Sequence, residues 1–310
     1  MQTATIQREF LQSEEWKNFQ QKLGVETFEV NCQGIHSLVC QMHFISNKSF
    51  LFIPRGPWGD VSAGGIGDWL EKLKEEGKRR RSVFIHLEPA YDKDHSLEDQ
   101  LTKLGFKPSP KEIEPRSTYF LELSRPLPEI FQSFKRGMRY NIKYSEREGL
   151  ELKIREDKGA AENFIGLYRE AAVGLKYKPF PENYYRLMCQ TLLGKIAKIF
   201  EIRYQGKIIS STIFIFYNKR ATALHTFALP QCKKLKCLSY ALFQGIAYAK
   251  ENGFEVFDFW GARDKKGLEG SAQLKENFNA KIQEYGAPLD YVLDKKYYHL
   301  WKIYRKIKSA

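Results

Sequence analysis

The second half of the chain repeats the first half at an offset of about 173 residues, and apolar positions recur with it. Each copy contains, in the same order, an apolar strand, a proline, a helical stretch and a second apolar strand. These segments are 50–53, Pro57, 69–76 and 83–87 in the first copy and 223–227, Pro230, 240–251 and 256–260 in the second. A closing strand follows at 118–121 and again at 291–294. Such a repeat indicates that one small fold occurs twice in the chain.

The rest of the sequence agrees with two domains of mixed composition. Aromatic and β-branched runs alternate with amphipathic stretches, which is typical of an α/β fold. With 310 residues, 43% of them hydrophobic, the chain can form two cores of roughly 150 residues each. We therefore expect a first domain at 1–148 and a second at 149–293. We expect residues 294–310 to form a short basic helix that packs on the first domain.

The charge balance is strongly basic. Fifty Lys and Arg residues against 37 Asp and Glu residues give a net charge of +13. This charge favours an anionic partner such as a phosphate group, a nucleic acid or an acidic membrane surface, but it does not choose among them. The first ten residues lack the apolar run of a signal peptide, and no run approaches the ~20 apolar residues of a membrane span. We therefore expect a cytoplasmic protein.

The cysteines predict no disulfide and no metal site. They are odd in number and form no CxxC pair, as expected for reduced thiols. The five are Cys32, Cys40, Cys189, Cys232 and Cys237. An acidic stretch at 92–95 resembles the metal motif of sugar-nucleotide enzymes, but it lies in a polar turn. His225 lies in an apolar strand, and we expect a core residue with its hydrogen bonds satisfied.

Two groups of cations are candidates for binding phosphate. A helix is predicted at 128–147, and at 100° per residue its apolar side chains fall on one side. The apolar residues are Ile130, Phe131, Phe134, Met138 and Ile142, and the cations Arg136, Arg139, Lys143 and Arg147 lie opposite. This row of cations could follow a phosphate backbone, and a solvated helix surface is the alternative. Lys233 and Lys234 precede a helix whose amide groups could hold a phosphate.

Standard catalytic motifs are missing. The sequence has no P-loop, no GxGxxG after a strand, no GxSxG and no HExxH. We therefore expect no metal, no cofactor and no covalent nucleophile.

Five segments nevertheless resemble the FemABX family, the aminoacyl-tRNA-dependent peptidyltransferases that build peptidoglycan cross-bridges. These segments, in order, are 10–16, 53–57, 139–149, 249–261 and 274–278. The resemblance implies two tandem GNAT-like domains with mixed sheets, which agrees with the duplication. The sequence departs from the family where the usual Phe-Lys-x-x-Phe-Gly is Leu274-Lys275 through Phe278-Asn279. No long helical hairpin interrupts the second half, as in the compact members of the family.

The resemblance also implies a chemistry that needs no nucleophile. An aminoacyl ester on tRNA is already activated, so amide formation requires mainly alignment and stabilisation of the developing oxyanion. Lys275 takes the position of the family's channel lysine, where its ammonium would meet the tRNA terminus or the oxyanion. Glu88 takes the position of an acidic residue that orients or deprotonates the acceptor amine. The alternatives are a helix-surface lysine and a salt-bridged carboxylate at a strand end.

Substrate-binding residues follow from the same resemblance. Lys178 and Tyr184 lie near the family's muropeptide-binding segment, where they would bind a phosphate and stack or hydrogen-bond. Arg55 would reach a phosphate, and Phe227 would line the same cleft in the second copy.

These expectations define a function and two alternatives. We expect transfer of an amino acid from aminoacyl-tRNA to the stem-peptide amine of a UDP-linked muropeptide or lipid II, in the cytoplasm or peripherally at the inner membrane face. The first alternative is a GNAT-type N-acyltransferase that uses acyl-CoA. Against it, residues 231–237 supply no glycine for close approach to a pyrophosphate. The second is a non-catalytic basic protein that binds RNA or membrane.

Overall fold

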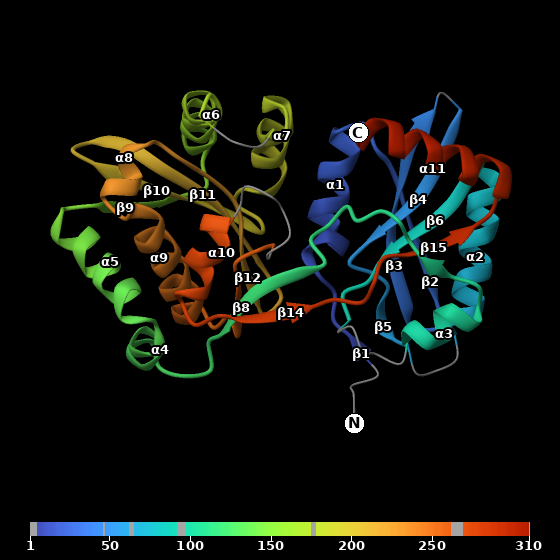
Figure 1. Cartoon of the computed structure of the whole chain (residues 1–310), viewed down its shortest axis with the longest axis horizontal. Coiled ribbons are helices and arrows are strands. Elements are labelled where there is room, and N and C mark those ends of the chain that lie inside the picture. The colour runs from blue at the N-terminus through green and yellow to red at the C-terminus, as the bar shows by residue number, and fades with distance from the viewer. Residues whose placement is uncertain are drawn as a thin grey trace. The chain divides into compact units, whose positions relative to one another are not determined.

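The computed structural model describes residues 5–45, 47–61, 65–91, 97–174, 178–261 and 269–309, so the acidic stretch at 92–95 lies outside it. The chain forms two compact units (Figure 1). Unit 1 comprises Met1–Arg116 and Glu284–Ala310, and unit 2 comprises Ser117–Gln283. Among the described residues, no helix has both the length and the apolar character that a membrane crossing needs.

Unit 1 is built on a mixed sheet with the strand order β1-β5-β3-β4-β6-β15-β7, in which β2 also pairs with β3. Its strands are β1 (Thr5–Ile6), β2 (Glu26–Cys32), β3 (Ile35–Ile45), β4 (Lys48–Pro54), β5 (Trp58–Asp60), β6 (Ser82–Glu88), β7 (Lys107–Pro108) and β15 (Leu289–Val292). Its helices are η1 (Phe10–Gln12), α1 (Glu14–Lys22), α2 (Ile66–Arg79), α3 (Leu97–Lys103) and α11 (Lys295–Ser309). Strands β4 and β6 are parallel, and the other pairs are antiparallel.

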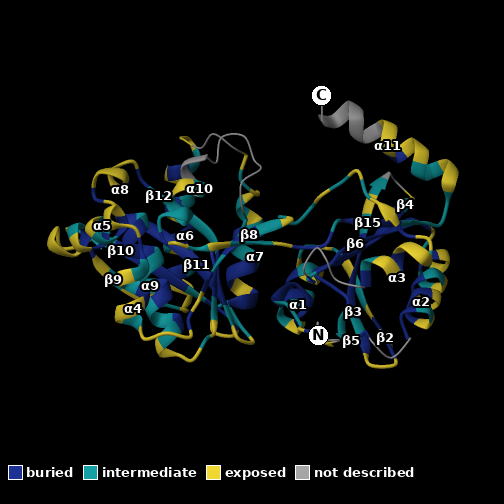
Figure 2. Cartoon of the chain, turned by 60° about the horizontal axis from the view of Figure 1, so that its bottom comes forward, coloured by how far each residue is buried: buried dark blue, intermediate teal, exposed yellow. Residues whose placement is uncertain are grey.

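Every residue of β6 is buried, because helices cover both faces of this strand. On one face, Trp69 and Leu73 of α2 join a core cluster with Ile85. On the other face, Trp301 of α11 packs on Phe84 with ring centroids 4.5 Å apart. Figure 2 shows the buried strands at the centre of the unit and exposed residues along the outer sides of its helices.

Unit 2 is built on a second mixed sheet with the order β14-β8-β13-β12-β11-β10-β9. Its strands are β8 (Ser117–Glu122), β9 (Glu151–Arg155), β10 (Ala197–Tyr204), β11 (Lys207–Tyr217), β12 (Arg220–Ala228), β13 (Val256–Asp258) and β14 (Lys281–Glu284). Its helices are α4 (Leu127–Ser133), α5 (Arg136–Arg147), α6 (Lys158–Ala172), α7 (Glu182–Leu192), α8 (Gln231–Lys234), α9 (Cys237–Glu251) and α10 (Glu269–Glu276). Strands β12 and β13 are parallel.

Helices cover both faces of this sheet as well. Phe227 of β12 contacts Phe164 of α6 at a centroid distance of 5.3 Å. On the opposite face, α9 lies close to β11, because a Cβ atom at Gly245 would come within 2.6 Å of the Phe214 ring. A glycine at this position therefore sets the distance between helix and sheet.

The duplication predicted from the sequence is present in the topology. In each unit an antiparallel meander leads into a parallel pair, and an antiparallel closing strand follows. However, each closing strand comes from the other half of the chain. The strand β8 pairs with β13 in unit 2, whereas β15 pairs with β6 in unit 1.

This exchange corrects the expected domain boundaries at 148/149 and 293/294. The chain leaves unit 1 after Arg116 and returns to it at Glu284. Helices α4 and α5 also belong to unit 2, because Ile130, Phe134 and Ile142 are part of its core cluster. The two closing strands are equivalent in the repeat, so their pattern does not show which sheet each one joins.

The single helix predicted at 128–147 is two helices. Phe134 and Lys135 have extended backbone angles, and they separate α4 from α5. The break is stabilised by a backbone hydrogen bond of 3.0 Å from Lys135 N to Asn277 O. Phe134 is thereby turned against Phe278, with ring centroids 5.0 Å apart.

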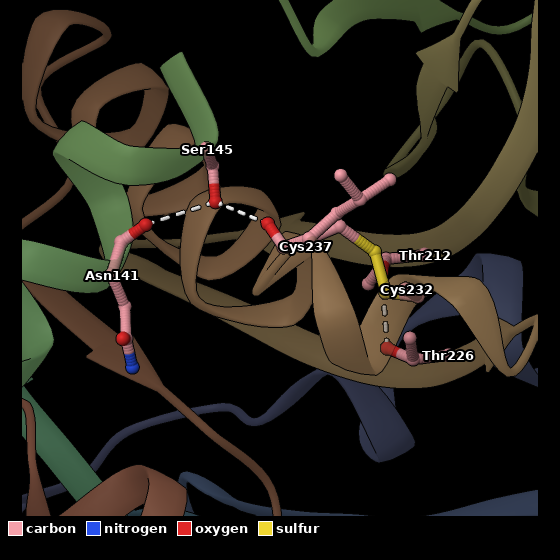
Figure 3. Close-up of a disulfide and its surroundings, with 7 residues drawn as sticks. Asn141, Ser145, Thr212, Thr226, Cys232 and Cys237 are labelled. Atoms are coloured by element: carbon pink, nitrogen blue, oxygen red, sulfur yellow. Dashed lines mark hydrogen bonds between the residues drawn. A yellow bond between two sulfur atoms is a disulfide. The ribbon is translucent and has the colours of Figure 1, made fainter. Parts of the chain in front are cut away.

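Two cysteines form a disulfide, so the prediction of five reduced thiols was wrong for this pair. Cys232 and Cys237 are joined with their Cα atoms 5.1 Å apart (Figure 3), and Cys32, Cys40 and Cys189 are free and buried. Between α8 and α9 the chain reverses at Lys236, whose φ of +57° is left-handed. This turn brings the two cysteines together, and no cysteine-spacing motif in the sequence predicts the disulfide.

Replacing both Cys232 and Cys237 by alanine should lower the free energy of unfolding by about 2 kcal/mol, because the disulfide closes a short loop in the unfolded chain. Chemical denaturation with and without a dithiol reductant measures this effect. The reductant should destabilise the wild type by a similar amount and leave the variant unchanged. An equal response of both proteins would contradict the prediction.

Candidate functional site

Lys275 lies near the end of α10, and backbone carbonyl groups surround its ammonium. Its Nζ atom donates hydrogen bonds of 2.6 Å to Trp260 O and to Gly261 O. Both acceptor residues have left-handed φ angles, +51° and +70°. This conformation is uncommon for a residue other than glycine, and such backbone strain is concentrated at functional sites. Burial lowers the pKa of Lys275 to about 8, although Asp258 acts in the opposite direction. Lys275 is therefore not a solvated helix-surface lysine.

Asp258, at the end of β13, holds this turn in place. Its Oδ1 atom accepts a 2.7 Å hydrogen bond from Trp260 N and another from the Thr118 hydroxyl. Its Oδ2 atom accepts a 3.0 Å bond from the Arg220 guanidinium, and the side chain is 1% exposed. Asp258 is not among the residues predicted from the sequence, although a carboxylate between two phenylalanines of an apolar strand is a signal that could have identified it.

Strands β12 and β13 separate beside this turn. Among the residues that the structure describes they pair at three positions, the last of which joins Thr222 to Asp258. Strand β12 continues to Ala228 in contact with β11, while the chain after Asp258 turns at Trp260. Phe227 and His225 therefore lie on the part of β12 that extends beyond β13.

An aromatic cluster forms around this part of β12. Phe227 is 2% exposed and lies 5.3 Å from the ring of Tyr185. Tyr184 stacks on Phe180 with ring centroids 4.1 Å apart, and Phe180 is 50% exposed. Lys178 is exposed next to this stack in the sequence. The cluster contains Tyr184 and Phe227, two of the predicted substrate-binding residues. Phe227, however, lies in the buried interior of the cluster.

His225 belongs to the same cluster and differs from the prediction. Its ring centroid lies 5.3 Å from that of Tyr185 and 6.0 Å from those of Tyr184 and Phe180. Its Nε2 atom is shielded from water and has no hydrogen-bond partner within the described parts of the chain. The expectation of a satisfied core histidine was therefore wrong for this atom. Burial lowers the pKa of His225 to about 4, so the ring is neutral at pH 7.

The lowered pKa of His225 predicts an acid-sensitive fold. The unfolded chain binds a proton near pH 6.5, whereas the folded protein does not bind it until about pH 4. The stabilisation is therefore complete above pH 6.5 and should decrease by about 3 kcal/mol as the pH falls to 4. Histidine NMR spectra should show His225 still neutral at pH 5.5. A normal titration midpoint would contradict the prediction.

Glu88 lies at the end of β6, in a buried network of unit 1. The His86 ring lies between two carboxylates, with Nδ1 2.6 Å from Asp290 Oδ1 and Nε2 3.0 Å from Glu88 Oε1. Glu88 also accepts backbone hydrogen bonds of 2.5 Å from Ile113 N and 2.7 Å from Glu114 N. The three acidic and imidazole groups are at most 2% exposed. This geometry favours the salt-bridged alternative, in which Glu88 ties a loop to the strand.

Burial alone would lower the pKa of His86, but the hydrogen bonds to Asp290 and Glu88 raise it above its usual value. The two carboxylates therefore favour the charged form of the buried His86 ring. This network is not predictable from local sequence, because its members come from positions 86, 88 and 290.

Arg55 is buried as well, with 3% of its surface exposed. Its guanidinium lies 3.8 Å from the centre of the Tyr285 ring and donates to Pro115 O. These contacts connect the two segments of unit 1.

The predicted phosphate-binding cations lie on neighbouring elements. Arg136 and Lys143 of α5 and Lys233 and Lys234 of α8 are exposed. Arg139 differs, because its guanidinium donates 2.9 Å to Gln132 O and also to Phe134 O, across the break between α4 and α5.

Helix α5 is held to the turn after α8 by one side chain. The Ser145 hydroxyl donates 2.8 Å to Leu235 O and lies 2.9 Å from Asn141 O (Figure 3). The two groups of cations therefore lie on directly connected elements. In the described residues, no cluster of His, Cys, Asp and Glu could hold a metal ion.

Two protein-family models match this chain. The model of the FemAB family matches residues 2–200, about two thirds of the chain. The chain belongs to the FemAB family. The model of the GNAT acetyltransferase domain matches residues 132–272, most of unit 2. Membership in the FemAB family supports a transferase of the general class that acts in peptidoglycan cross-bridge synthesis.

Solved structures show the same tandem fold. A crystal structure of FemX is similar with a TM-score of 0.85 and 16% identity over 94% of both chains. The C-terminal domain of a putative lysylphosphatidylglycerol synthetase from Agrobacterium fabrum has a TM-score of 0.61 and 13% identity, over 94% of this chain and 90% of that one. A tandem GNAT protein from the clavulanic acid biosynthesis pathway has a TM-score of 0.51 and 10% identity, over 84% and 79%. A search of curated protein sequences found no match.

Proposed function

We propose that this FemAB-family protein transfers an amino acid from aminoacyl-tRNA to the stem-peptide amine of a peptidoglycan precursor, either UDP-linked or lipid-linked. The proposed location is the cytoplasm, with peripheral contact at the inner membrane face. The observation that carries the proposal is Lys275, a partly buried ammonium fixed on two carbonyl groups beside the point where β12 and β13 separate. No metal or cofactor takes part in the proposed reaction.

The contacts of Lys275 suit the stabilisation of an oxyanion. An ammonium has three N–H groups, and Trp260 O and Gly261 O accept from two of them. In our proposal the third N–H donates to the oxyanion that forms when the amine attacks the ester carbonyl. Asp258 keeps the two carbonyl groups oriented through Trp260 N, so it is a positioning residue.

The lowered pKa of Lys275 suits the second half of the reaction. As the tetrahedral intermediate collapses, the C–N bond remains, the C–O bond to the ribose breaks, and the ribose oxygen needs a proton. The attacking amine releases a proton in the same reaction, so the protons balance. A group with a pKa of about 8 exchanges protons readily near neutral pH, and Lys275 can donate to the leaving oxygen.

The proposed acceptor site uses the exposed part of the aromatic cluster. Phe180 and Tyr184 present a stacked pair at the start of α7, and Lys178 adds a cation for a phosphate group. The proposed tRNA contacts are the exposed cations of α5 and α8: Arg136, Lys143, Lys233 and Lys234. Arg139 and Arg55 serve as internal contacts, and Glu88 is not required as a base.

A transfer assay tests the proposal. Purified protein is incubated with a mixture of aminoacyl-tRNAs and with either the UDP-linked or the lipid-linked precursor, and mass spectrometry detects the added residue. Uncharged tRNA with free amino acid is the negative control, and acetyl-CoA replaces the tRNA in a parallel reaction. The proposal fails if no aminoacyl-tRNA supports transfer to either precursor, or if only the acyl-CoA does.

A further inference from the structure

Helix α11 is fixed to unit 1 by one of its sides. Trp301 is 2% exposed and packs against Phe84 and Tyr298, at centroid distances of 4.5 and 5.4 Å. The Tyr298 hydroxyl donates 2.6 Å to Asp290, which belongs to the buried network of His86. The aromatic side of this helix is therefore used for packing within the unit.

The other side of the helix exposes aliphatic side chains. Leu300 is 44% exposed and Ile303 is 45% exposed. Residues three positions apart lie side by side on a helix, so these two side chains form one apolar surface. Four basic residues on the same helix are also exposed: Lys295, Lys296, His299 and Lys302. We call Leu300, Ile303 and these four residues the outer face of α11.

The charged side chains of the C-terminal segment that contains α11 are all positive. Residues 295–310 contain six Lys and Arg residues and no Asp or Glu. A helix with an aliphatic strip beside lysines is typical of segments that lie in the interface of an anionic membrane. Each lysine near an anionic bilayer contributes about a fivefold increase in binding.

The observations favour a lipid surface over RNA. Single-stranded RNA is bound by aromatic rings on which its bases stack, and the described rings of Trp301 and Tyr298 are occupied by packing. Leu300 and Ile303 would gain nothing from a phosphate backbone, whereas they would be buried among acyl chains. We propose that the outer face of α11 docks on an anionic lipid bilayer. Docking also favours the lipid-linked acceptor, and that step alone rests on the proposed function.

Vesicle binding by the whole protein tests the docking. Co-sedimentation is measured with vesicles of equal parts phosphatidylcholine and phosphatidylglycerol, and with vesicles of pure phosphatidylcholine. The wild type should bind the anionic vesicles and release them at high salt, because salt screens the lysines. No donor or acceptor is needed, so this result is independent of the transfer assay.

Matched substitutions locate the contact. The double variant Leu300→Ser/Ile303→Ser should bind anionic vesicles at least tenfold more weakly, and Lys295→Gln/Lys296→Gln should lose about fivefold for each lysine. The double variant Ile154→Ser/Val173→Ser also changes two exposed aliphatic residues, 38% and 91% exposed, and should bind like the wild type. Circular dichroism confirms that each variant is folded.

Three results would overturn the proposal. The first is no binding of the wild type to anionic vesicles. The second is unchanged binding of the Leu300→Ser/Ile303→Ser variant. The third is full competition by a short single-stranded RNA with the vesicles, together with an equal loss of RNA binding in the Lys295→Gln/Lys296→Gln variant. That result would assign this face to RNA.

Discussion

Replacing Lys275 by methionine should lower kcat for aminoacyl transfer by about 100- to 1,000-fold, the usual effect of removing one donor to an oxyanion. Methionine keeps much of the volume of the side chain but cannot donate a hydrogen bond. Single-turnover rates with saturating aminoacyl-tRNA measure the effect. Because protonated Lys275 is the donor, the wild-type rate should also decline as the pH rises above about 8.

The same substitution should not destabilise unit 2 strongly. The pKa of Lys275 is lowered in the folded protein, so keeping the ammonium charged at pH 7 costs free energy, by the linkage argument roughly 3 kcal/mol. Methionine removes this cost, which offsets the loss of the two hydrogen bonds to Trp260 O and Gly261 O. We expect a melting temperature equal to or above that of the wild type.

Lys250 provides the matched control for Lys275. Its Nζ atom also donates to two backbone carbonyls, 2.7 Å to Leu123 O and 3.4 Å to Ser124 O, but it lies on α9 and has no role in the proposed reaction. Lys250→Met should keep the wild-type kcat. If Lys275→Met keeps it too, or if both variants lose it equally, the assignment of Lys275 is wrong.

Replacing Asp290 by alanine should have the largest effect on stability, a loss of about 3 to 5 kcal/mol. Asp290 is fully buried and accepts hydrogen bonds from His86 (2.6 Å), the Ser109 hydroxyl (2.8 Å) and the Tyr298 hydroxyl (2.6 Å). Its removal takes an acceptor away from the buried His86 ring and from two partly buried hydroxyl groups. Calorimetry should show a melting temperature lower by about 10 °C or more. Glu75→Ala, which removes an exposed carboxylate of the same unit, should shift it by little.

The network of His86 should also make the stability of the fold depend on pH. The direction is opposite to the effect of His225, because the pKa of His86 is raised and that of His225 is lowered. The pKa of His86 is raised in the folded state, so its stabilisation is complete below the unfolded value near 6.5 and is lost as the pH rises through the folded pKa. Unfolding free energies measured across neutral and alkaline pH should show this loss in the wild type. The loss should be smaller in Asp290→Ala, and an identical profile would contradict the role of the network.

The sequence predicted the parts of this protein that depend on local pattern. The repeat, the mixed α/β composition and the buried side of the helix near Ile142 are periodic signals, and the structure contains all of them. Lys275 was selected by resemblance, and the structure adds its two carbonyl partners and its lowered pKa. Asp258 lies in the segment 249–261 that resembles the family, but only its contacts reveal its role.

Other features were decided by contacts between distant segments. The strands at 118–121 and 291–294 are equivalent in pattern, so only the pairing of β8 with β13 and of β15 with β6 shows that they are exchanged. The network of His86 joins residues about 200 positions apart, and the disulfide depends on a single left-handed residue, Lys236.

The amino-acid order by itself determined that two similar domains form and which side chains enter their cores, because hydrophobic periodicity depends on neighbouring residues. Tertiary structure alone decided which strand closes each sheet, which buried charges are paired and which nitrogen of His225 is left without a partner among the described residues. The physical reason is that burial, pairing and desolvation of a polar group are set by whichever distant segments pack around it.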